Sequence, residues 1–302
     1  MIVCEGLQRH MPIDRRGLVT LVGRGNANIV VSFGDDDKIL YRLSIRNKDS
    51  IIANNSYTLA NWDFIQKEII PRLGSYLCPM ELTELELKNE LAGIYSSYVT
   101  IETEKIRTLL SFKLPNLRSK SEFENCLYKD HQTVLYTTPS QNTYILEIKP
   151  KWLHNPVQYC RNCTHNKYKT RNINYCYRNL LSGNGAYIKD ILFSTEVSSD
   201  KLGIMAKYFS QENNVLQKLY NEQLNTYNEF QRRKDDKPAL LMTLRDVSCF
   251  VKWDFFVNKE TLFLDANVNA SIIDVDLKPA EKRRHWIDIE NTLNSFESKV
   301  YH

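Results

Sequence analysis

A strand pattern begins with Gly17-Leu18-Val19-Thr20-Leu21-Val22, passes a turn at Gly23-Arg24-Gly25-Asn26-Ala27, and resumes in Asn28-Ile29-Val30-Val31-Ser32-Phe33. A second turn, Gly34-Asp35-Asp36-Asp37, leads to the run Ile39-Leu40-Tyr41-Arg42-Leu43-Ser44-Ile45. Alternating, β-branched runs joined by short turns are typical of antiparallel strands. The sequence therefore predicts a three-stranded β-meander near the N-terminus.

Beyond the meander, helical and strand patterns follow in irregular order. Asn61 is expected to cap a helix that carries Trp62, Ile65 and Ile69 and breaks at Pro71. The further expected elements are strands over 132–136 and 143–148, a helix from about 205 to 232, a strand-rich segment 239–256, a strand over 270–276 and a charged helix containing Trp286. This order predicts an α+β fold rather than a regular alternation of strand and helix.

Length and composition narrow the class of protein. A chain of 302 residues suggests about two domains, and 42% hydrophobic residues are enough for a sizeable core. The 40 Lys+Arg against 36 Asp+Glu give a net charge of +4, which excludes a histone-like protein. No apolar run reaches the roughly 18 residues that span a bilayer, and the N-terminus lacks the pattern of a secretory signal. Seven cysteines, an odd count, do not suggest a disulfide framework, so we expect an intracellular, reduced protein.

Positive charge gathers in one segment. Residues 149–178 contain seven Lys or Arg and no Asp or Glu: Lys149, Lys151, Arg161, Lys167, Lys169, Arg171 and Arg178. Such a basic block indicates an anionic partner, although a solvated basic face would show the same composition. Trp152, Tyr159, Tyr168, Tyr175 and Tyr177 interleave with these charges, which keeps a nucleic-acid interface open.

Cysteines in the same segment form half of a zinc pattern. Cys160-x-x-Cys163-x-His165, with Cys176 further on, offers candidate ligands, but a zinc ribbon usually has a second Cys pair. We expect reduced, buried cysteines here. Zinc and a redox dithiol are the alternatives.

Two acidic motifs come late in the chain. Asp246, in Arg245-Asp246-Val247-Ser248, is a candidate base for a hydroxyl group. Asp274 and Asp276 would point to one face of the expected strand 270–276 and could hold Mg²⁺, or could simply face solvent. The glycine turn at 23–28 could cradle phosphates with its backbone N–H groups, or could be a plain hairpin turn. With Arg42 on the third strand, these parts suggest phosphoryl transfer.

Six stretches in order resemble motifs of the inositol-pentakisphosphate 2-kinase family. They are Gly25-Asn26-Ala27-Asn28-Ile29-Val30, Glu147-Ile148-Lys149-Pro150-Lys151-Trp152, Cys160-Arg161-Asn162-Cys163-Thr164-His165, Leu181-Ser182-Gly183-Asn184, Arg245-Asp246-Val247-Ser248 and Asp274-Val275-Asp276-Leu277-Lys278-Pro279. Thr164, Leu181 and Val247 replace the Met, Phe and Cys that are more common there, and none of these changes removes a charged group. The ordered set covers nearly the whole chain.

The resemblance implies a two-lobed, distantly protein-kinase-like α+β fold, with an N-lobe over 1–131 that has an antiparallel sheet and a helix, and a larger mixed C-lobe over 132–302. It implies transfer of the ATP γ-phosphate, with Mg²⁺, to the 2-hydroxyl of inositol 1,3,4,5,6-pentakisphosphate, giving inositol hexakisphosphate (phytate). It also implies a protein of the nucleus or of both nucleus and cytoplasm. By default we expect a monomer that needs no nucleic acid and does not insert into a membrane.

The resemblance assigns roles residue by residue. Asp246 matches the catalytic base, Lys149 assists it, and Asp274 with Asp276 matches the metal site. The segment Lys129-Asp130-His131 is similar to the hinge that meets adenine. ATP contacts fall on Gly23, Arg24, Gly25, Asn26, Ala27, Asn28, Arg42, Asp130, His131 and Asp274. Substrate contacts fall on Arg46, Lys149, Lys151, Lys169, Asn179, Asn184, Lys278, Lys282 and Trp286.

Two other functions remain to be weighed. A nucleic-acid-binding module would use the basic and aromatic residues of 149–178 and would leave Asp274 and Asp276 without a role. A catalytically dead kinase-like scaffold is disfavoured because Lys149, Asp246 and Asp274 are all present. The resemblance adds no support for zinc at Cys160 and Cys163.

Overall fold

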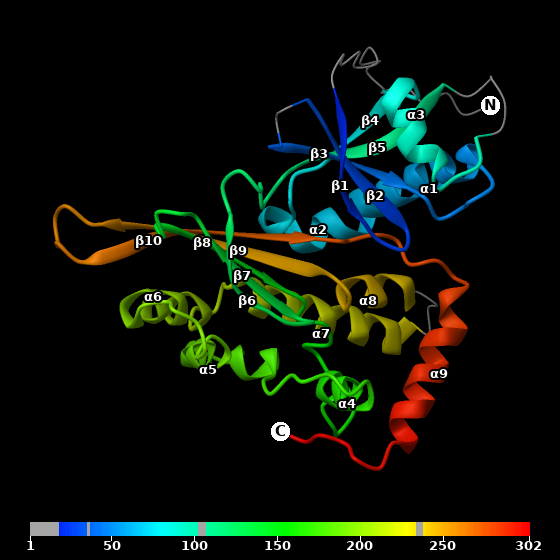
Figure 1. The fold of residues 1–302 in the computed structure, drawn as a ribbon. Coiled ribbons are helices and arrows are strands. Elements are labelled where there is room, and N and C mark those ends of the chain that lie inside the picture. The colour runs from blue at the N-terminus through cyan, green and yellow to red at the C-terminus, as the bar shows by residue number, and fades with distance from the viewer. Residues whose placement is uncertain (1–17, 35–36, 102–106, 234–237) are drawn as a thin grey trace. The chain divides into compact units, whose positions relative to one another are not determined.

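The computed structural model describes residues 18–34, 37–101, 107–233 and 238–302. The expected acidic turn at Asp35 and Asp36 and the N-terminal segment lie outside the described residues. The described chain is a mixed α+β structure that forms two compact units (Figure 1). Unit 1 comprises Met1–Phe64 and Cys78–Ser121, and unit 2 comprises Ile65–Leu77 and Glu122–His302. The predicted lobe boundary at 131/132 and the roles of the lobes stay predictions.

Unit 1 is built on a five-stranded antiparallel sheet in the order β1-β2-β3-β5-β4. Its strands are β1 Val19–Arg24, β2 Asn28–Phe33, β3 Ile39–Ser44, β4 Glu81–Glu86 and β5 Thr108–Pro115. The first three strands confirm the predicted meander. Helix α1 (Ile51–Phe64) packs on β3 and β5, and α3 (Asn89–Ser96) contacts β1. Ile29, Val31, Tyr41, Leu43 and Leu109 are fully or almost fully buried in the core of this unit.

The helix predicted to begin at Asn61 begins ten residues earlier. Ser50 caps α1, because its hydroxyl oxygen accepts the N–H of Ala53 at 3.2 Å. Asn61 lies inside the helix and is 1% exposed, so its assignment as the cap is wrong. The predicted break at Pro71 is also wrong, because Pro71 lies in the first turn of α2 (Ile70–Leu73), where a missing N–H costs little. Gly74, at φ +52°, ends that helix.

Unit 2 holds the second five-stranded antiparallel sheet, in the order β10-β9-β8-β7-β6. Its strands are β6 Asn125–Lys129, β7 Thr133–Thr137, β8 Thr143–Ile148, β9 Ser248–Val257 and β10 Leu264–Ile273. The predicted strands 132–136 and 143–148 are thereby confirmed. The segment predicted as strand-rich over 239–256 instead starts as helix α8 (Pro238–Leu244) before β9.

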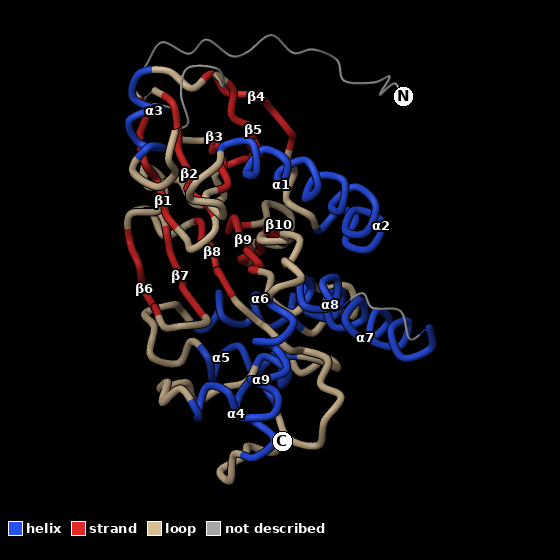
Figure 2. The backbone as a smooth tube through the Cα atoms, turned by 90° about the vertical axis from the view of Figure 1, so that its right-hand side faces the viewer, coloured by secondary structure: helices blue, strands red, loops and turns tan. Residues whose placement is uncertain are grey.

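Helices of unit 2 gather on one side of its sheet, as the ribbon and tube views both show (Figures 1 and 2). They are α4 Arg161–Tyr168, α5 Ile188–Ile191, α6 Ser199–Phe209, α7 Val215–Arg233, α8 and α9 Lys282–Ser295. A π-helix spans Ile65–Ile69, and short 3₁₀ turns span Gly74–Tyr76, Tyr177–Leu180 and Gly185–Tyr187. The charged helix around Trp286 is confirmed as α9.

The single long helix predicted over 205–232 is two helices. Helix α6 ends at Phe209, and α7 starts at Val215. Asn214 causes the restart, because its side-chain oxygen accepts the N–H groups of Leu216 at 2.9 Å and Gln217 at 3.0 Å. None of the helices of the described residues is both long and apolar enough to cross a membrane.

Candidate active site

Three charged segments of unit 2 meet at one edge of its sheet. Strand β8 ends at Ile148, which pairs with Cys249 at the start of β9, and β10 ends at Ile273, which pairs with Ser248. Because neighbouring strands run antiparallel, the segment after β8, the segment before β9 and the segment after β10 all emerge at the same edge. These segments carry Lys151, Asp246 and Lys278, which we call the Lys–Asp–Lys cluster.

Asp246 is held between the two lysines of this cluster. One carboxylate oxygen accepts a hydrogen bond from Lys151 Nζ, and the other accepts from Lys278 Nζ at 2.7 Å. Burial acts to raise the pKa of Asp246, but the charges and hydrogen bonds of Lys151 and Lys278 outweigh it and lower the pKa. The Asp246 carboxylate is therefore anionic near neutral pH, and its side chain stays 46% exposed to solvent.

A buried glutamine aligns two of the three segments. Gln223 on α7 is fully buried, and its amide nitrogen donates to the backbone oxygens of Lys151 and Leu244, each at 2.9 Å. Its side-chain oxygen accepts the N–H of His154 at 2.9 Å. Gln223 thus ties the backbone of Lys151 to that of the residues just before Asp246. Sequence reasoning missed it, although a polar residue on the apolar face of a helix, four positions after Leu219, was a visible signal.

Residues that flank Asp246 and Lys151 are locked by stacking. Arg245 lies 3.8 Å from the centre of the Trp152 ring, and Arg161 lies 4.1 Å from it. Arg161 also forms an ion pair with Glu290 of α9 at 2.7 Å. Burial lowers the pKa of Arg245 to about 9, and the Arg245 side chain has two buried nitrogens without a hydrogen-bond partner. These contacts hold Arg245 and Trp152, which are next to Asp246 and Lys151 in the sequence, in defined orientations.

The predicted metal pair has a different geometry from the one expected. Strand β10 ends at Ile273, so the prediction that Asp274 and Asp276 share a strand face is wrong. Asp274 has φ +62° and is exposed, with one carboxylate oxygen accepting from the Ser248 hydroxyl at 2.9 Å. Asp276 is 7% exposed, and its backbone oxygen accepts from the Thr243 hydroxyl at 2.7 Å. The turn at Asp274 breaks the two-residue alternation that the prediction assumed.

The remaining predicted substrate residues of unit 2 are spread over several elements. Lys149 follows β8 with its side chain 42% exposed, 3.6 Å from Glu147. Lys169 is exposed at the end of α4, and Lys282 is exposed at the start of α9, where Trp286 is half-buried. Asn179 lies in a 3₁₀ turn, and Asn184 is exposed. Hydrogen bonds join Lys151, Asp246 and Lys278 directly. The six predicted substrate residues of this paragraph instead lie on several separate segments.

Aromatic residues of the basic block are mostly covered. Trp152, Tyr159 and Tyr177 are 8%, 5% and 1% exposed, and Tyr175 is half-buried. Tyr168 is the exception, with 39% of its surface exposed. Arg161 of the same block is also buried against Trp152 and Glu290. The block therefore does not offer the row of open rings on which bases of a single strand stack.

Asp130 and His131 form the tip of the β6–β7 hairpin. The Asp130 backbone N–H donates to the Thr133 oxygen at 2.8 Å. One Asp130 carboxylate oxygen accepts the N–H groups of Gln132 and Thr133, and the other accepts the hydroxyls of Tyr128 and Tyr175, all at 2.7 to 2.8 Å. The Asp130 side chain thus shapes the hairpin, His131 is exposed, and their contact with adenine stays a prediction.

The glycine turn of unit 1 closes the β1–β2 hairpin. Gly25 donates its N–H to the Asn28 oxygen at 2.9 Å, and Ala27 accepts the N–H of Ile45 at 2.8 Å. A Cβ at Gly23 would meet nothing within 4 Å, and one at Gly25 would meet only the Asn28 oxygen at 3.8 Å. Since neither glycine has a positive φ, neither packing nor backbone conformation requires glycine at these positions. Asn26 lies in the same turn.

Three arginines of unit 1 stack on rings. Arg24 lies 4.7 Å from the centre of the Tyr98 ring and Arg42 lies 5.3 Å from that of Phe112. Arg46 lies 4.4 Å from the centre of the Tyr57 ring, and its Nε is buried without a hydrogen-bond partner. Aromatic stacking orients the planes of these three guanidinium groups.

Comparison with known proteins decides the family. The family model described as inositol-pentakisphosphate 2-kinase matches residues 22–215 and 194–292. The chain belongs to the inositol-pentakisphosphate 2-kinase family. Its resemblance to that family, its nature as a kinase and its place in inositol phosphate metabolism are thereby confirmed.

Curated relatives match over nearly their whole length. The inositol-pentakisphosphate 2-kinase of Saccharomyces cerevisiae is 35% identical over 93% of this chain and 98% of its own length. Those of Candida glabrata and Eremothecium gossypii are 34% and 32% identical, over 93% and 94% of this chain and all of their own length. The family match ends at residue 292, ten residues before His302.

Proposed function

We propose that this chain transfers the γ-phosphate of ATP to the 2-hydroxyl of inositol 1,3,4,5,6-pentakisphosphate, which gives inositol hexakisphosphate. The family match carries the class of reaction. The observation that carries the mechanism is the Asp246 carboxylate, anionic and half-exposed between Lys151 and Lys278. One cluster thereby combines a base for a hydroxyl proton with cations for a phosphorylated substrate.

Substrate charge explains why lysines surround the base. Five phosphate monoesters bring about −8 to −10 charges to the site at neutral pH. Lys149 and Lys151 follow the end of β8, and Lys278 follows the end of β10, on the other side of β9. All three supply positive charge at the same sheet edge. Phosphoryl transfer asks little covalent chemistry of the protein, so orientation and charge neutralisation supply most of the rate enhancement.

Binding of the substrate would also release the base. Without substrate, both oxygens of Asp246 accept hydrogen bonds from lysines. Phosphate groups compete for the same ammonium groups, because they carry more charge than a single carboxylate. As the lysines turn toward phosphate, an Asp246 oxygen becomes free to accept the proton of the 2-hydroxyl.

Gly23 to Asn28 are proposed to hold the ATP phosphates, with Arg42 as a further phosphate contact and Arg46 as a contact to the inositol phosphate. No side chain covers the backbone at Gly23 and Gly25, where packing does not require glycine, so a phosphate group could approach this turn closely. We therefore expect Gly25→Ala to leave the melting temperature unchanged and to raise KM for ATP about tenfold, because the new methyl group obstructs a phosphate oxygen. Parallel measurements of thermal unfolding and ATP dependence test this. An unchanged KM would remove the turn from the nucleotide site.

Asp274 and Asp276 are proposed to hold Mg²⁺ with the nucleotide. Their carboxylates are the hard oxygen ligands that Mg²⁺ takes, and the Asp274 group is exposed while Ser248 fixes one of its oxygens, so the residues fit the ion. When bound, Mg²⁺ offsets phosphate charge. Ser248 and the turn at Asp274 keep that carboxylate in one orientation.

The family resemblance also suggests roles for the two units and for the remaining candidate residues, and a location in the cell. We propose that the two units correspond to the lobes of a distant protein-kinase-like fold, with the hairpin tip at Asp130 and His131 contacting adenine. We further propose that Lys169, Asn179, Asn184, Lys282 and Trp286 contact the inositol phosphate, and that the protein acts as a monomer in the nucleus or in nucleus and cytoplasm.

The competing function is a nucleic-acid-binding module that uses residues 149–178. The burial of Trp152, Tyr159 and Tyr177 disfavours it. Incubation with radiolabelled ATP and inositol pentakisphosphate separates the two functions. We expect ATP-dependent label in inositol hexakisphosphate and no tight binding of single-stranded RNA. RNA binding without transfer of label would overturn the kinase proposal.

A further inference from the structure

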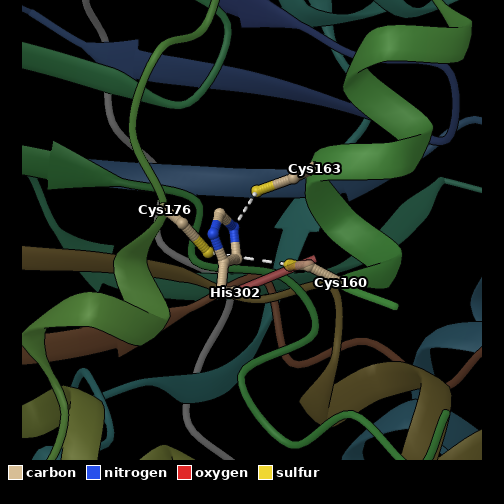
Figure 3. Close-up of side chains that lie close together, drawn as sticks. All are labelled: Cys160, Cys163, Cys176 and His302. Carbon is tan, nitrogen blue, oxygen red and sulfur yellow. Dashed lines mark hydrogen bonds between the residues drawn. The ribbon is translucent and has the colours of Figure 1, made fainter. Parts of the chain in front are cut away.

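Three cysteines and a histidine of unit 2 come together in a second group that shares no residue with the Lys–Asp–Lys cluster. Figure 3 shows the four side chains pointing toward one another. Their candidate ligand atoms all lie within 4.8 Å of one another. We call this group the Cys/His cluster; its members are Cys160, Cys163, Cys176 and His302. The sequence pattern had offered His165 as the nitrogen ligand, and the structure instead brings His302, 137 positions further along the chain.

The spacing of the ligand atoms matches a tetrahedral site. With zinc–sulfur bonds of about 2.3 Å, two sulfurs of a tetrahedron lie about 3.8 Å apart. The Sγ atoms of Cys160 and Cys176 are 3.7 Å apart. The Nε2 of His302 lies 3.2 Å from the Cys163 Sγ, which is also close to a tetrahedral edge. Small side-chain movements would therefore bring all four atoms into coordination distance of one ion.

Hydrogen bonds and a ring contact hold two of the three parts of this cluster together, helix α4 and the segment that carries His302. Cys160 donates its N–H to the Val300 oxygen at 2.7 Å, and Val300 donates its N–H to the Thr164 hydroxyl at 3.0 Å. These two bonds fasten the segment that carries His302 to helix α4. The Tyr168 and Phe296 rings meet edge to face at 5.6 Å and fasten it a second time. The site is thus formed by the fold and does not depend on exposed side chains alone.

The burial and the chemistry of the four ligands fit a structural metal site. Cys160 and Cys176 are 1% and 2% exposed, so a bound ion would be shielded from solvent on that side. Three thiolates and one imidazole are a ligand set that zinc takes in structural sites, and four protein ligands leave no open position for catalysis. Coordination releases the thiol protons to solvent, so no oxidant or reductant is needed.

We propose that the Cys/His cluster binds one structural zinc ion that joins α4, the segment before the 3₁₀ turn at Tyr177–Leu180, and the segment after α9. The ion fixes the last segment onto α4, whose end carries Lys169. The proposal stands apart from the kinase reaction, because metal content and coordination can be measured without substrate.

Metal analysis of the full chain, purified without a polyhistidine tag or chelator, is the first test. We expect about one zinc per chain, and after exchange for Co²⁺ the visible bands of tetrahedral coordination with a thiolate charge-transfer band in the near ultraviolet. A protein with neither zinc nor those Co²⁺ bands would overturn the proposal, as would a mass two hydrogens lower that reports a disulfide between Cys160 and Cys176.

Variants locate the site. We expect Cys176→Ser to lose zinc, and His302→Ala to keep its fold and bind zinc at least tenfold more weakly with an altered Co²⁺ spectrum. Cys126→Ser is the matched control, since Cys126 is an exposed thiol of β6 outside the cluster. Should Cys176→Ser fail to fold, His302→Ala still decides, because His302 is exposed. Equal zinc content and spectra in His302→Ala and Cys126→Ser would place the metal elsewhere and contradict the proposal.

Discussion

The Lys–Asp–Lys cluster and the Cys/His cluster are built in similar ways and are expected to act differently. Each joins three segments of unit 2. The first is charged and half-exposed, with Asp246 46% open to solvent, while two thiols of the second are almost fully buried. An exposed charge cluster can exchange its internal partners for a substrate, whereas thiols closed off from solvent cannot, so we expect the second cluster to serve stability. The difference in solvent access therefore distinguishes a cluster suited to catalysis from a cluster suited to stabilising the fold.

Substitution at Asp246 is expected to have the largest effect on turnover. Asp246→Asn removes the base and should lower kcat about 10³-fold, with little change in the melting temperature. Asp254→Asn is the matched control, because Asp254 is also 47% exposed and has a lysine, Lys252, 3.4 Å away. Steady-state phosphorylation of inositol pentakisphosphate gives the readout. Equal kcat for the two variants would remove the distinction between Asp246 and an ordinary surface carboxylate.

Removal of one lysine should change the pH dependence of the reaction. Lys151 and Lys278 lower the pKa of Asp246 against the opposing effect of burial. In Lys151→Met one of these charges is lost, so the pKa of Asp246 rises and the carboxylate becomes protonated at a higher pH. The acidic limb of kcat should therefore move to higher pH, and kcat/KM should fall about 30-fold through lost phosphate contact.

A pH series for wild type and Lys151→Met, with Lys252→Met as control, measures this shift. An acidic limb that stays in place would contradict the role of Lys151 in holding the charge of Asp246.

Gln223 should affect both the stability of the protein and its turnover. Gln223→Leu leaves the Lys151 and Leu244 oxygens without their buried donor, which costs about 1–3 kcal/mol of stability. Because the two backbones are then no longer aligned, we expect kcat to fall about tenfold. Gln217→Leu, on the same helix but with an exposed amide, is the control. A loss of stability without a change in kcat at low temperature would make Gln223 purely structural.

Removal of zinc should have the smallest effect on turnover. Cys176→Ser, or treatment with a chelator, should lower the melting temperature by about 4–8 °C, as expected for about 2 kcal/mol in a unit of this size. At low temperature kcat should stay within about twofold of wild type, since no member of the Cys/His cluster belongs to the Lys–Asp–Lys cluster. Thermal unfolding with and without chelator measures the effect, and Cys126→Ser should show none.

The limits of sequence-based prediction follow from where each signal lies. Both ends of strand β8 were predicted correctly, because the pattern of Thr143–Ile148 is that of a strand and a proline follows it at Pro150. Helix α1 was placed too late, because buried polar residues such as Asn54 and Thr58 hide its apolar face. The break at Asn214 was missed because asparagine fits a cap and a helix surface equally well in sequence.

Candidate site residues were predictable only where they lie in short sequence motifs. Asp246, Lys151 and Lys278 were found through motifs, and the register of β8, β9 and β10 explains why they meet. The positive φ of Asp274 interrupts the strand that was expected to carry both Asp274 and Asp276, and no sequence pattern indicates this backbone conformation. Gln223 and His302 act through contacts with distant segments, so only the folded chain reveals them.

A crossed measurement on two variants separates the roles of the two clusters. Turnover of ATP and inositol pentakisphosphate and the melting temperature are measured together for Asp246→Asn and Cys176→Ser. The account predicts that Asp246→Asn loses turnover and keeps its melting temperature, while Cys176→Ser loses melting temperature and keeps its turnover in the cold. If both variants lose the same property, or if Asp246→Asn still forms inositol hexakisphosphate at the wild-type rate, the division between a chemical and a structural cluster is wrong.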